Sequence, residues 1–496
     1  GKCEYGALCR YGAGHCDPVT GVNLERLQCL GGVVAVDAIN QLSKDTQYRL
    51  RKNQYPFICP RNAKSKKDKN KNKKRQNAAD ETAGDKQDRV ARELAAAEVN
   101  KRAFNLDAFP DKEIKLVDFS NKIYVAPLTT VGNLPFRRIM KHFKADITCG
   151  EMAMAANLLG GKNSEWALLR RHSSEDIFGV QVAGAFPDML TRVAELISGE
   201  IKTDFVDLNM GCPIDIVVNR GSGSALMNTG GHRIQDIVRG MGKALNCSLT
   251  LKMRLGWSEK KPLAHEIVRN VERIDADQRV AAIMVHGRSR LQRYSKTADW
   301  NYIHRVASQP QNEDHSRARI PIIGNGDIFS YTDWERHLAA NSGISTCCML
   351  ARGALIKPWL PTEIKEQRHW DITSKERLDI LKDFCHFGLE HWGSDQQGVN
   401  KTRRFLLEWL SFLYRYIPVG LLERLPQHMN DRPPPFMGRD DLETLMASPN
   451  SADWVKISEM LLGPVPEDFQ FLPKHKSNSY SADGQSAQNS KGMPEG

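Results

Sequence analysis

A single cysteine at the end of an apolar strand is the residue in this chain best placed to do chemistry. Residues 205–210 read Phe-Val-Asp-Leu-Asn-Met, and the turn Gly211-Cys212-Pro213 follows directly. Such a turn places the thiol in a strand-end loop, where parallel α/β barrels keep their reactive groups. With an ordinary thiol pKa of about 8.5, Cys212 is mostly protonated at neutral pH and could serve as a general acid; a lowered pKa would make it a nucleophile. The residues alone leave both roles open.

Three further polar side chains interrupt or end apolar strands. Gln181 offers an amide donor and acceptor to a flavin or pyrimidine edge, although a core glutamine bonded to backbone is the simpler alternative. Lys252 could stabilise an anionic reduced flavin, or it could pair with a neighbouring acid. His286 ends another strand beside several arginines, which favours a ligand role over a solvated histidine. With Cys212, these residues indicate a flavin reductase that acts on a nucleobase.

Two glycine-containing turns predict a phosphate site. Residues 324–327 read Gly-Asn-Gly-Asp, and residues 351–353 read Ala-Arg-Gly. Glycines let backbone N–H groups approach an anion, and Arg352 can add a charge-assisted contact. Each turn alone is a common structural feature. Together they follow the seventh and eighth predicted strands, which is where barrels of this class bind phosphate.

Short apolar runs alternate with helix-like segments from about residue 118 onward, and this alternation predicts parallel βαβ units. Eight such units match a (β/α)8 TIM barrel, which takes ~250 residues. An open doubly wound sheet is the alternative, but it would more often carry a Gly-x-Gly-x-x-Gly turn after its first strand. The eight runs are Ile123–Leu128, Ala145–Cys149, Ile177–Val182, Phe205–Leu208, Leu249–Met253, Ala281–Val285, Ile320–Ile323 and Ser345–Leu350.

The remaining segments differ in composition from the barrel. Residues 366–470 form a small all-α domain with amphipathic stretches, in which the basic and aromatic run 401–416 favours core packing over RNA stacking. The composition predicts a disordered basic linker at 61–90, a short helix within 32–60 and a disordered tail at 473–496.

The net charge and isoelectric point of the chain favour a nucleic-acid partner. The chain has 496 residues, a net charge of +11 and a pI near 9.0, and the basic linker supplies much of the excess. Eleven cysteines without a secretory pattern indicate a reducing compartment. No apolar stretch is long enough to span a membrane and no signal peptide is visible, and the initial glycine suggests an N-terminally truncated chain.

These motifs together resemble the tRNA-dihydrouridine synthase family, and the resemblance covers roughly residues 118–470. Eight segments in the family's order carry it: 125–137, 179–184, 207–213, 251–254, 285–288, 298–300, 324–327 and 351–353. Residues 150–155, 364–370 and 401–410 further resemble a eukaryotic branch that modifies uridine 47 in the tRNA variable loop.

The resemblance implies an FMN-binding, catalytic barrel at 118–365 that uses NADPH as reductant, followed by a tRNA-binding helical domain at 366–470. It assigns the cofactor contacts to Pro127, Leu128, Thr129, Gln181, Lys252, His286, Asn325, Gly326, Asp327, Ala351 and Arg352.

The implied reaction reduces a uridine in tRNA to 5,6-dihydrouridine. Hydride from reduced FMN goes to C6 of uracil, and Cys212 matches the family's acid that protonates C5. The uridine must be turned out of its helix to reach the site. Asn209, Arg288, Arg290 and Arg293 are expected to contact the substrate or tRNA, with solvated surface arginines as the alternative. We expect a monomer.

Residues 1–31 resemble part of a CCCH-type zinc finger. Cys3, Cys9 and His15 have suitable spacing for zinc, but four ligands are needed and the first cysteine would precede this chain. The resemblance therefore implies a partial finger with weak or no zinc binding.

Two other functions are open to the same residues. One is a barrel flavoenzyme acting on a free pyrimidine, similar to a dihydroorotate dehydrogenase; it leaves the basic charge and the helical domain unexplained. The other is an RNA-binding scaffold with an inactive barrel. A cytoplasmic or nuclear location is expected, and messenger RNA is a further substrate to test.

Overall fold

The computed structural model describes residues 38–59 and 106–474, apart from positions 115, 230, 276, 424 and 426 and the stretches 309–318, 341–346, 428–435 and 467–468. The zinc finger expected at 1–31, the linker at 61–90 and nearly all of the tail at 473–496 lie outside the described residues.

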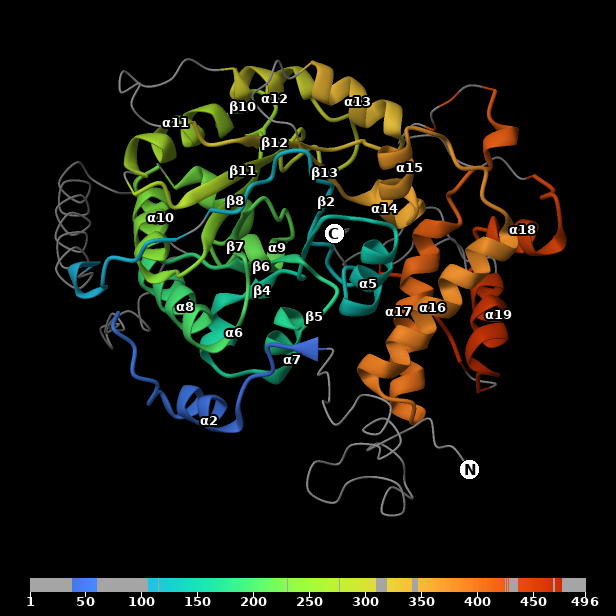
Figure 1. Ribbon diagram of the computed structural model, residues 1–496, viewed down its shortest axis with the longest axis horizontal. Coiled ribbons are helices and arrows are strands. Elements are labelled where there is room, and N and C mark those ends of the chain that lie inside the picture. Colours follow the sequence, from blue (N-terminus) through green and yellow to red (C-terminus); the bar gives the residue numbers. More distant parts are fainter. Residues whose placement is uncertain are drawn as a thin grey trace, which may run out of the picture.

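Eight parallel strands in the described part close into a barrel, which confirms the predicted TIM fold over the open sheet (Figure 1). They follow one another round the barrel in chain order, and pairing of β3 with β6 closes it. Each predicted apolar run overlaps one strand. The strands are β2 Tyr124–Val125, β3 Ile147–Cys149, β6 Ile177–Ala183, β7 Phe205–Met210, β8 Ser248–Arg254, β11 Val280–His286, β12 Ile322–Asn325 and β13 Cys348–Leu350, with β4 Ala153–Met154 also paired to β6.

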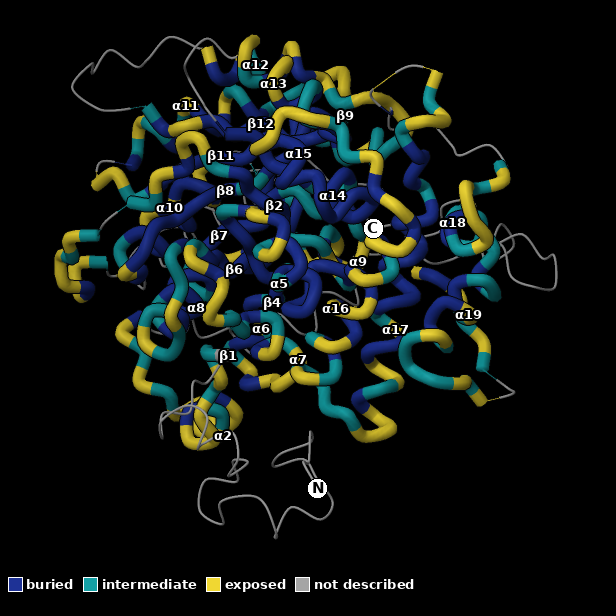
Figure 2. The backbone as a smooth tube through the Cα atoms, turned by 45° about the vertical axis from the view of Figure 1, so that its right-hand side comes forward, coloured by how far each residue is buried: buried dark blue, intermediate teal, exposed yellow. Residues whose placement is uncertain are grey.

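Inward-facing side chains change from apolar to polar toward the mouth of the barrel. Side chains two apart on a strand share a face, so Phe205, Asp207 and Asn209 of β7 form successive inward layers. The lower layer is hydrophobic, and Phe205 packs there against Phe119 and Tyr124, with ring centroids 5.6 and 5.8 Å away. The polar layers therefore rest on packed hydrophobic side chains, and Figure 2 shows that the barrel strands are mostly buried.

Helices cover the outside of the barrel, and local capping fixes where several begin. The side chain of Asn133 accepts a hydrogen bond from Phe136 N at the start of α5, and Ser330 does the same for Asp333 N at the start of α13. The helices are α5 Leu134–His142, α6 Ala155–Leu159, α7 Asn163–Trp166, α8 Pro187–Glu200, α9 Asp215–Val218, α10 His232–Ala244, α11 Ala264–Ile274, α12 Trp300–Ala307, α13 Tyr331–Ala339, α14 Arg352–Ile356 and α15 Leu360–Glu366.

Short elements complete the connections. A two-stranded pair joins β9 Gly256–Ser258 to β10 Lys261–Pro262. Short 3-10 helices cover Leu106–Ala108, Ala167–Leu169, Gly223–Asn228 and Val419–Leu421. Across the described ranges, every helix is too short or too polar to cross a bilayer.

A helical appendage packs against one side of the barrel and completes the predicted fold class (Figure 1). It consists of α16 Ser374–Trp392, α17 Gln396–Leu413, α18 Asp441–Met446 and α19 Ser451–Leu462. Trp409 of α17 docks it: the indole N–H donates to Leu355 O (3.0 Å), and the ring meets Phe136 of α5 edge-on. Leu406, Leu407 and Trp409 are buried, so the aromatic run in α17 is core.

An N-terminal segment is tied to the outside of the barrel beside α8. β1 Ala38–Ile39 pairs with β5 Arg171–His172, and α2 spans Lys44–Lys52. Thr46 donates to Glu200 of α8 (2.9 Å), and the backbone of Ile58 donates to Glu195 (2.6 Å). The short helix expected within 32–60 is present.

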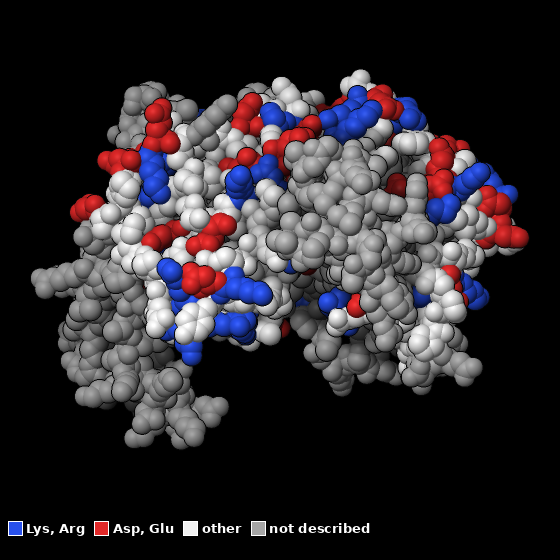
Figure 3. Space-filling model, turned by 60° about the horizontal axis from the view of Figure 1, so that its bottom comes forward, with Lys and Arg blue, Asp and Glu red and all other residues white. Residues whose placement is uncertain are grey.

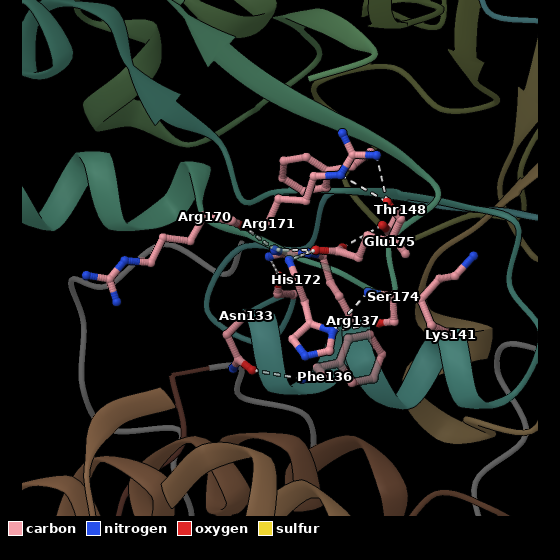
Figure 4. Close-up of polar contacts among 12 residues, drawn as sticks. Asn133, Phe136, Arg137, Lys141, Thr148, Arg170, Arg171, His172, Ser174 and Glu175 are labelled. Atoms are coloured by element: carbon pink, nitrogen blue, oxygen red, sulfur yellow. Dashed lines mark hydrogen bonds and ion pairs between the residues drawn. The ribbon is translucent and has the colours of Figure 1, made fainter. Parts of the chain in front are cut away.

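A buried ion pair ties α5 to the strands (Figure 4). Arg137 donates through Nε to Glu175 Oε1 (2.7 Å), and both side chains are almost fully buried. The same carboxylate accepts hydrogen bonds from Thr148 Oγ1 (2.6 Å) and His172 N (2.9 Å). All the charge of Arg137 is thus balanced by one acid inside the protein.

Candidate active site at the barrel mouth

The structure brings the predicted polar side chains together at the carboxyl ends of the strands. Gln181 lies in β6, Asn209 in β7, Lys252 in β8, His286 in β11 and Asn325 in β12. Backbone register places Asn209 opposite Lys252, and His286 opposite Asn325. Five residues far apart in sequence therefore face one mouth.

A chain of hydrogen bonds fixes the two amides. Asn209 Nδ2 donates to Gln181 Oε1 (2.8 Å), and Gln181 Nε2 donates to Asp207 Oδ2 (2.6 Å). The other oxygen of Asp207 accepts from Thr250 Oγ1 (2.8 Å). Because a carboxylate only accepts, it determines which end of the Gln181 amide points away from it.

Asp207 is fully buried and was not among the predicted site residues. Burial raises the pKa of its carboxyl to about 7, while the hydrogen bonds from Gln181 and Thr250 and the charge of Lys252 oppose that rise. The sequence could have indicated Asp207 as a site residue, because a carboxyl group inside an apolar strand needs a partner as much as the ammonium of Lys252 does.

Cys212 is presented to the mouth by Asn209, near the end of β7. Asn209 Oδ1 accepts hydrogen bonds from the backbone N–H groups of Gly211 (3.1 Å) and Cys212 (2.9 Å), which forms a tight turn. Cys212 is only partly buried, whereas the other cysteines of the described residues are all buried. Burial still raises the pKa of the Cys212 thiol, so the thiol stays protonated at neutral pH.

Lys252 carries an ammonium that the protein does not neutralise directly. No carboxylate of the described residues lies within ion-pair distance of it, although the more distant Asp207 favours its charge. Burial lowers the pKa of Lys252 to about 8, and the nearby Arg254 adds to that effect. An unpaired cation in a partly buried site is suited to an anionic ligand.

His286 is neutral in this environment. Its pKa lies well below the usual value, chiefly through burial and further through Arg254, Lys252 and Arg288. Arg288 Nη1 lies 3.3 Å from His286 Nε2, and because an arginine only donates, that ring nitrogen accepts. The proton of the imidazole is therefore on Nδ1.

The seventh and eighth strand ends form a crowded backbone cradle. Asn325 Nδ2 donates to Met349 O (2.8 Å) and ties the two strands together. Gly326 has φ 128°, and a Cβ there would approach Ala298 Cβ to 2.7 Å. A Cβ at Gly353 would lie 2.1 Å from Ile328 O. Only glycine fits these positions, so backbone N–H groups can line the cradle.

Asp327 holds two arginines at the edge of this cradle. Its carboxylate accepts two hydrogen bonds from Arg288 Nη2 (2.8 and 2.7 Å) and one from Ala298 N (2.7 Å), and Arg352 Nη2 lies 3.4 Å away. Asp327 thus positions cations and would repel a phosphate if it faced one.

The three arginines after His286 have different environments. Arg288 is fully buried and paired with Asp327, so it lies within the site and away from the outer surface. Arg290 pairs with Asp215 of α9 (2.7 Å) and lies over the Trp257 ring (4.0 Å). Arg293 adopts a positive φ of 46° in the same loop.

Tyr294 is a second residue that sequence reasoning missed. Its ring lies 4.2 Å from Arg352 Cζ and 5.6 Å from Arg254 Cζ, and its centroid is 6.2 Å from that of His286. The sequence drew attention to the arginines of this loop and gave no sign that its tyrosine turns inward.

Pro127, Leu128 and Thr129 follow β2 on the same rim. Gly132 N donates to Leu128 O (2.7 Å), and Thr130, with φ 73°, donates through its N–H to Glu151 (2.6 Å). Ala351 comes directly after β13 and precedes α14. No group of three or more His, Cys, Asp or Glu side chains suited to a metal occurs among the residues described.

Comparisons with known proteins show the family to which the chain belongs. The family described as Dihydrouridine synthase (Dus) matches residues 124–405. The chain is 52% identical to a Xenopus tropicalis protein named tRNA-dihydrouridine(47) synthase [NAD(P)(+)]-like, over 97% of this chain and 73% of that protein. Proteins of the same name from Homo sapiens and Oryza sativa subsp. japonica are 50% and 60% identical, covering 97% and 74% of this chain and 74% and 52% of theirs. The chain belongs to the dihydrouridine synthase family.

Proposed function

We propose that this enzyme reduces a uridine of tRNA, at position 47 in the variable loop, to 5,6-dihydrouridine, with NADPH as reductant and FMN as the flavin. Family membership and the names of the relatives support the reaction and its substrate. The observation that carries the proposal is the Lys252 ammonium, which has no carboxylate partner within the described part of the chain, near the partly buried thiol of Cys212 at a barrel mouth with a glycine cradle.

The residues present fit a flavin mononucleotide. Lys252 supplies a cation for the ring, and the amide of Gln181 offers its remaining hydrogen-bonding capacity to a ring edge. The backbone at Asn325, Gly326 and Ala351, with Arg352, would hold the phosphate. When bound, FMN supplies the hydride that adds to C6 of uracil.

Cys212 completes the reduction by giving a proton to C5. Its raised pKa keeps the proton on sulfur until the ring needs it, and Asn209 fixes the backbone that aims the thiol. The neutral His286 can donate from Nδ1 without placing a second positive charge beside Lys252.

An RNA substrate is favoured over a free pyrimidine by charge. The chain carries +11, and a free base needs neither that excess nor a helical appendage. Cys3, Cys9 and His15 as zinc ligands, a monomeric state, a cytoplasmic or nuclear location and action on messenger RNA stay predictions.

The test compares substrates with the purified protein. It should be yellow, and NADPH should bleach the flavin under anaerobic conditions. It should then convert uridine to dihydrouridine in tRNA transcribed without modification, with free uridine unreacted. Cys212→Ala should keep the flavin and its reduction while tRNA reduction falls by about 100-fold or more. Activity on free uridine alone would favour the pyrimidine enzyme, and a colourless protein the inactive scaffold.

A further inference from the structure

Three large apolar side chains are exposed on the segments that connect the carboxyl ends of barrel strands to the following helices. Phe186 follows β6 and is 44% exposed, Ile216 follows β7 and is 65% exposed, and Leu291 follows β11 and is 62% exposed. Loops on this side surround the active site in a TIM barrel. We refer to Phe186, Ile216 and Leu291 as the rim arc.

Direct contacts join the loops that carry the rim arc. Asp215, which precedes Ile216, pairs with Arg290, which precedes Leu291, at 2.7 Å. The loop before Phe186 meets the loop after α9, because a Cβ at Gly221 would lie 3.4 Å from Ala185 Cβ. The three apolar side chains therefore belong to one stretch of the rim, on the side where Cys212 leaves β7.

Unpaired cations accompany this apolar surface. Arg220 and Arg233 are exposed, and neither has an acidic partner among the described residues. Arg233 Cζ lies 6.0 Å from the centroid of the Phe186 ring. The only acid of α9 is Asp215, which Arg290 already neutralises. Free arginines beside an exposed aromatic ring are complementary to a flexible, single-stranded nucleic acid.

We propose that the rim arc is the contact surface for the unpaired nucleotides that flank the target uridine. Their bases lie against Phe186, Ile216 and Leu291, and their phosphates meet Arg220 and Arg233. An extruded uridine leaves its neighbours without a stacking partner, and apolar side chains replace that partner. This inference rests on the proposed function and adds which residues hold the RNA at the site.

The experiment measures steady-state kinetics on unmodified tRNA with the full, flavin-loaded protein. Phe186→Ala should raise KM about 10-fold with flavin content unchanged, since loss of one stacked base weakens binding by that order. Phe186→Trp should restore a KM near that of the unsubstituted protein, whereas Phe186→Leu should not. Leu291→Ala and Ile216→Ala, at positions too exposed to threaten folding, should each raise KM several-fold.

Tyr48→Ala is the matched control, because Tyr48 is 56% exposed on α2, away from the rim. It should leave KM unchanged. Unchanged KM in all three rim variants would overturn the proposal, as would equal rescue by leucine and tryptophan. Loss of self-association in the rim variants without a change in KM would assign the arc to a second copy of the chain. Failure of the unsubstituted protein to reduce tRNA would instead refute the proposed function.

Discussion

Cys212 owes its suitability as an acid to partial burial. Its pKa lies above that of an ordinary thiol, so the protonated form, which is the active one, persists to higher pH. The rate of uridine reduction by pre-reduced enzyme should therefore stay level up to at least about pH 8.5 and fall only as the pH passes the raised pKa. Single-turnover measurements across this range check the prediction. A rate that instead rises with pH across this range would mean that the thiolate is the active form, as for a nucleophile.

Lys252 should make flavin binding depend on pH as well, with binding weakened as its ammonium is deprotonated. With a pKa of about 8, its ammonium is present below pH 8 and is lost above it. The affinity of flavin-free protein for FMN should therefore fall as pH rises through 8. Lys252→Gln should bind FMN about 10-fold more weakly at pH 7 and lose this pH dependence. Fluorescence titration of FMN measures both. The same pH dependence in Lys252→Gln would place the titrating group elsewhere.

Single residues show where sequence reasoning succeeds and where it stops. Gln181 and Lys252 were found because a polar group in an apolar strand demands an explanation. Asp207 is also a polar group in an apolar strand, but the sequence analysis included it only as part of the segment 207–213 and not as a site residue. Tyr294 and the burial of Arg288 depend on the path of one loop, and local sequence does not fix a loop path.

At the scale of elements, the Arg137–Glu175 pair joins α5 to β3 and β5. Glu175→Gln leaves the buried guanidinium without a counter-charge, and such a loss destabilises a protein by about 3 kcal/mol. The midpoint of urea unfolding should drop accordingly, with the slope unchanged. Asp379→Asn breaks an exposed pair with Lys382 on α16 and should change stability by about 0.5 kcal/mol or less. Equal effects would mean that Glu175 contributes no more than a surface charge.

The strands were predictable because each is buried on both faces and so reads as a continuous apolar run. Their closure into a barrel followed from the number of units. The long connection between β7 and α10 was not predictable: it holds α9 and the 3-10 turn Gly223–Asn228, and neither follows a simple periodicity. Part of the site lies on such connections, so the positions of its side chains were harder to predict from the sequence than the barrel strands were.

At the scale of the whole molecule, net charge alone does not locate the RNA. On the face shown in Figure 3, basic and acidic side chains are intermixed. Many surface cations are paired, for example Lys382 with Asp379 and Lys296 with Glu259. Cations without a partner should therefore contribute most of the attraction to phosphate.

Arg220 and Arg233 allow local charge to be separated from total charge. Replacing both with glutamine lowers the net charge from +11 to +9, and so does replacing Lys44 and Lys52 of α2. If tRNA phosphates contact these arginines, the slope of log Kd for tRNA against log salt concentration should fall by about 1.5 in the arginine variant, because each lost phosphate contact removes ~0.7–0.9 from the slope. The lysine variant should keep the slope of the unsubstituted protein. Binding assays across a range of KCl concentrations measure the slope. Equal reductions in the two variants would show that tRNA responds to the total charge of the protein, and the rim would then have no special part in holding it.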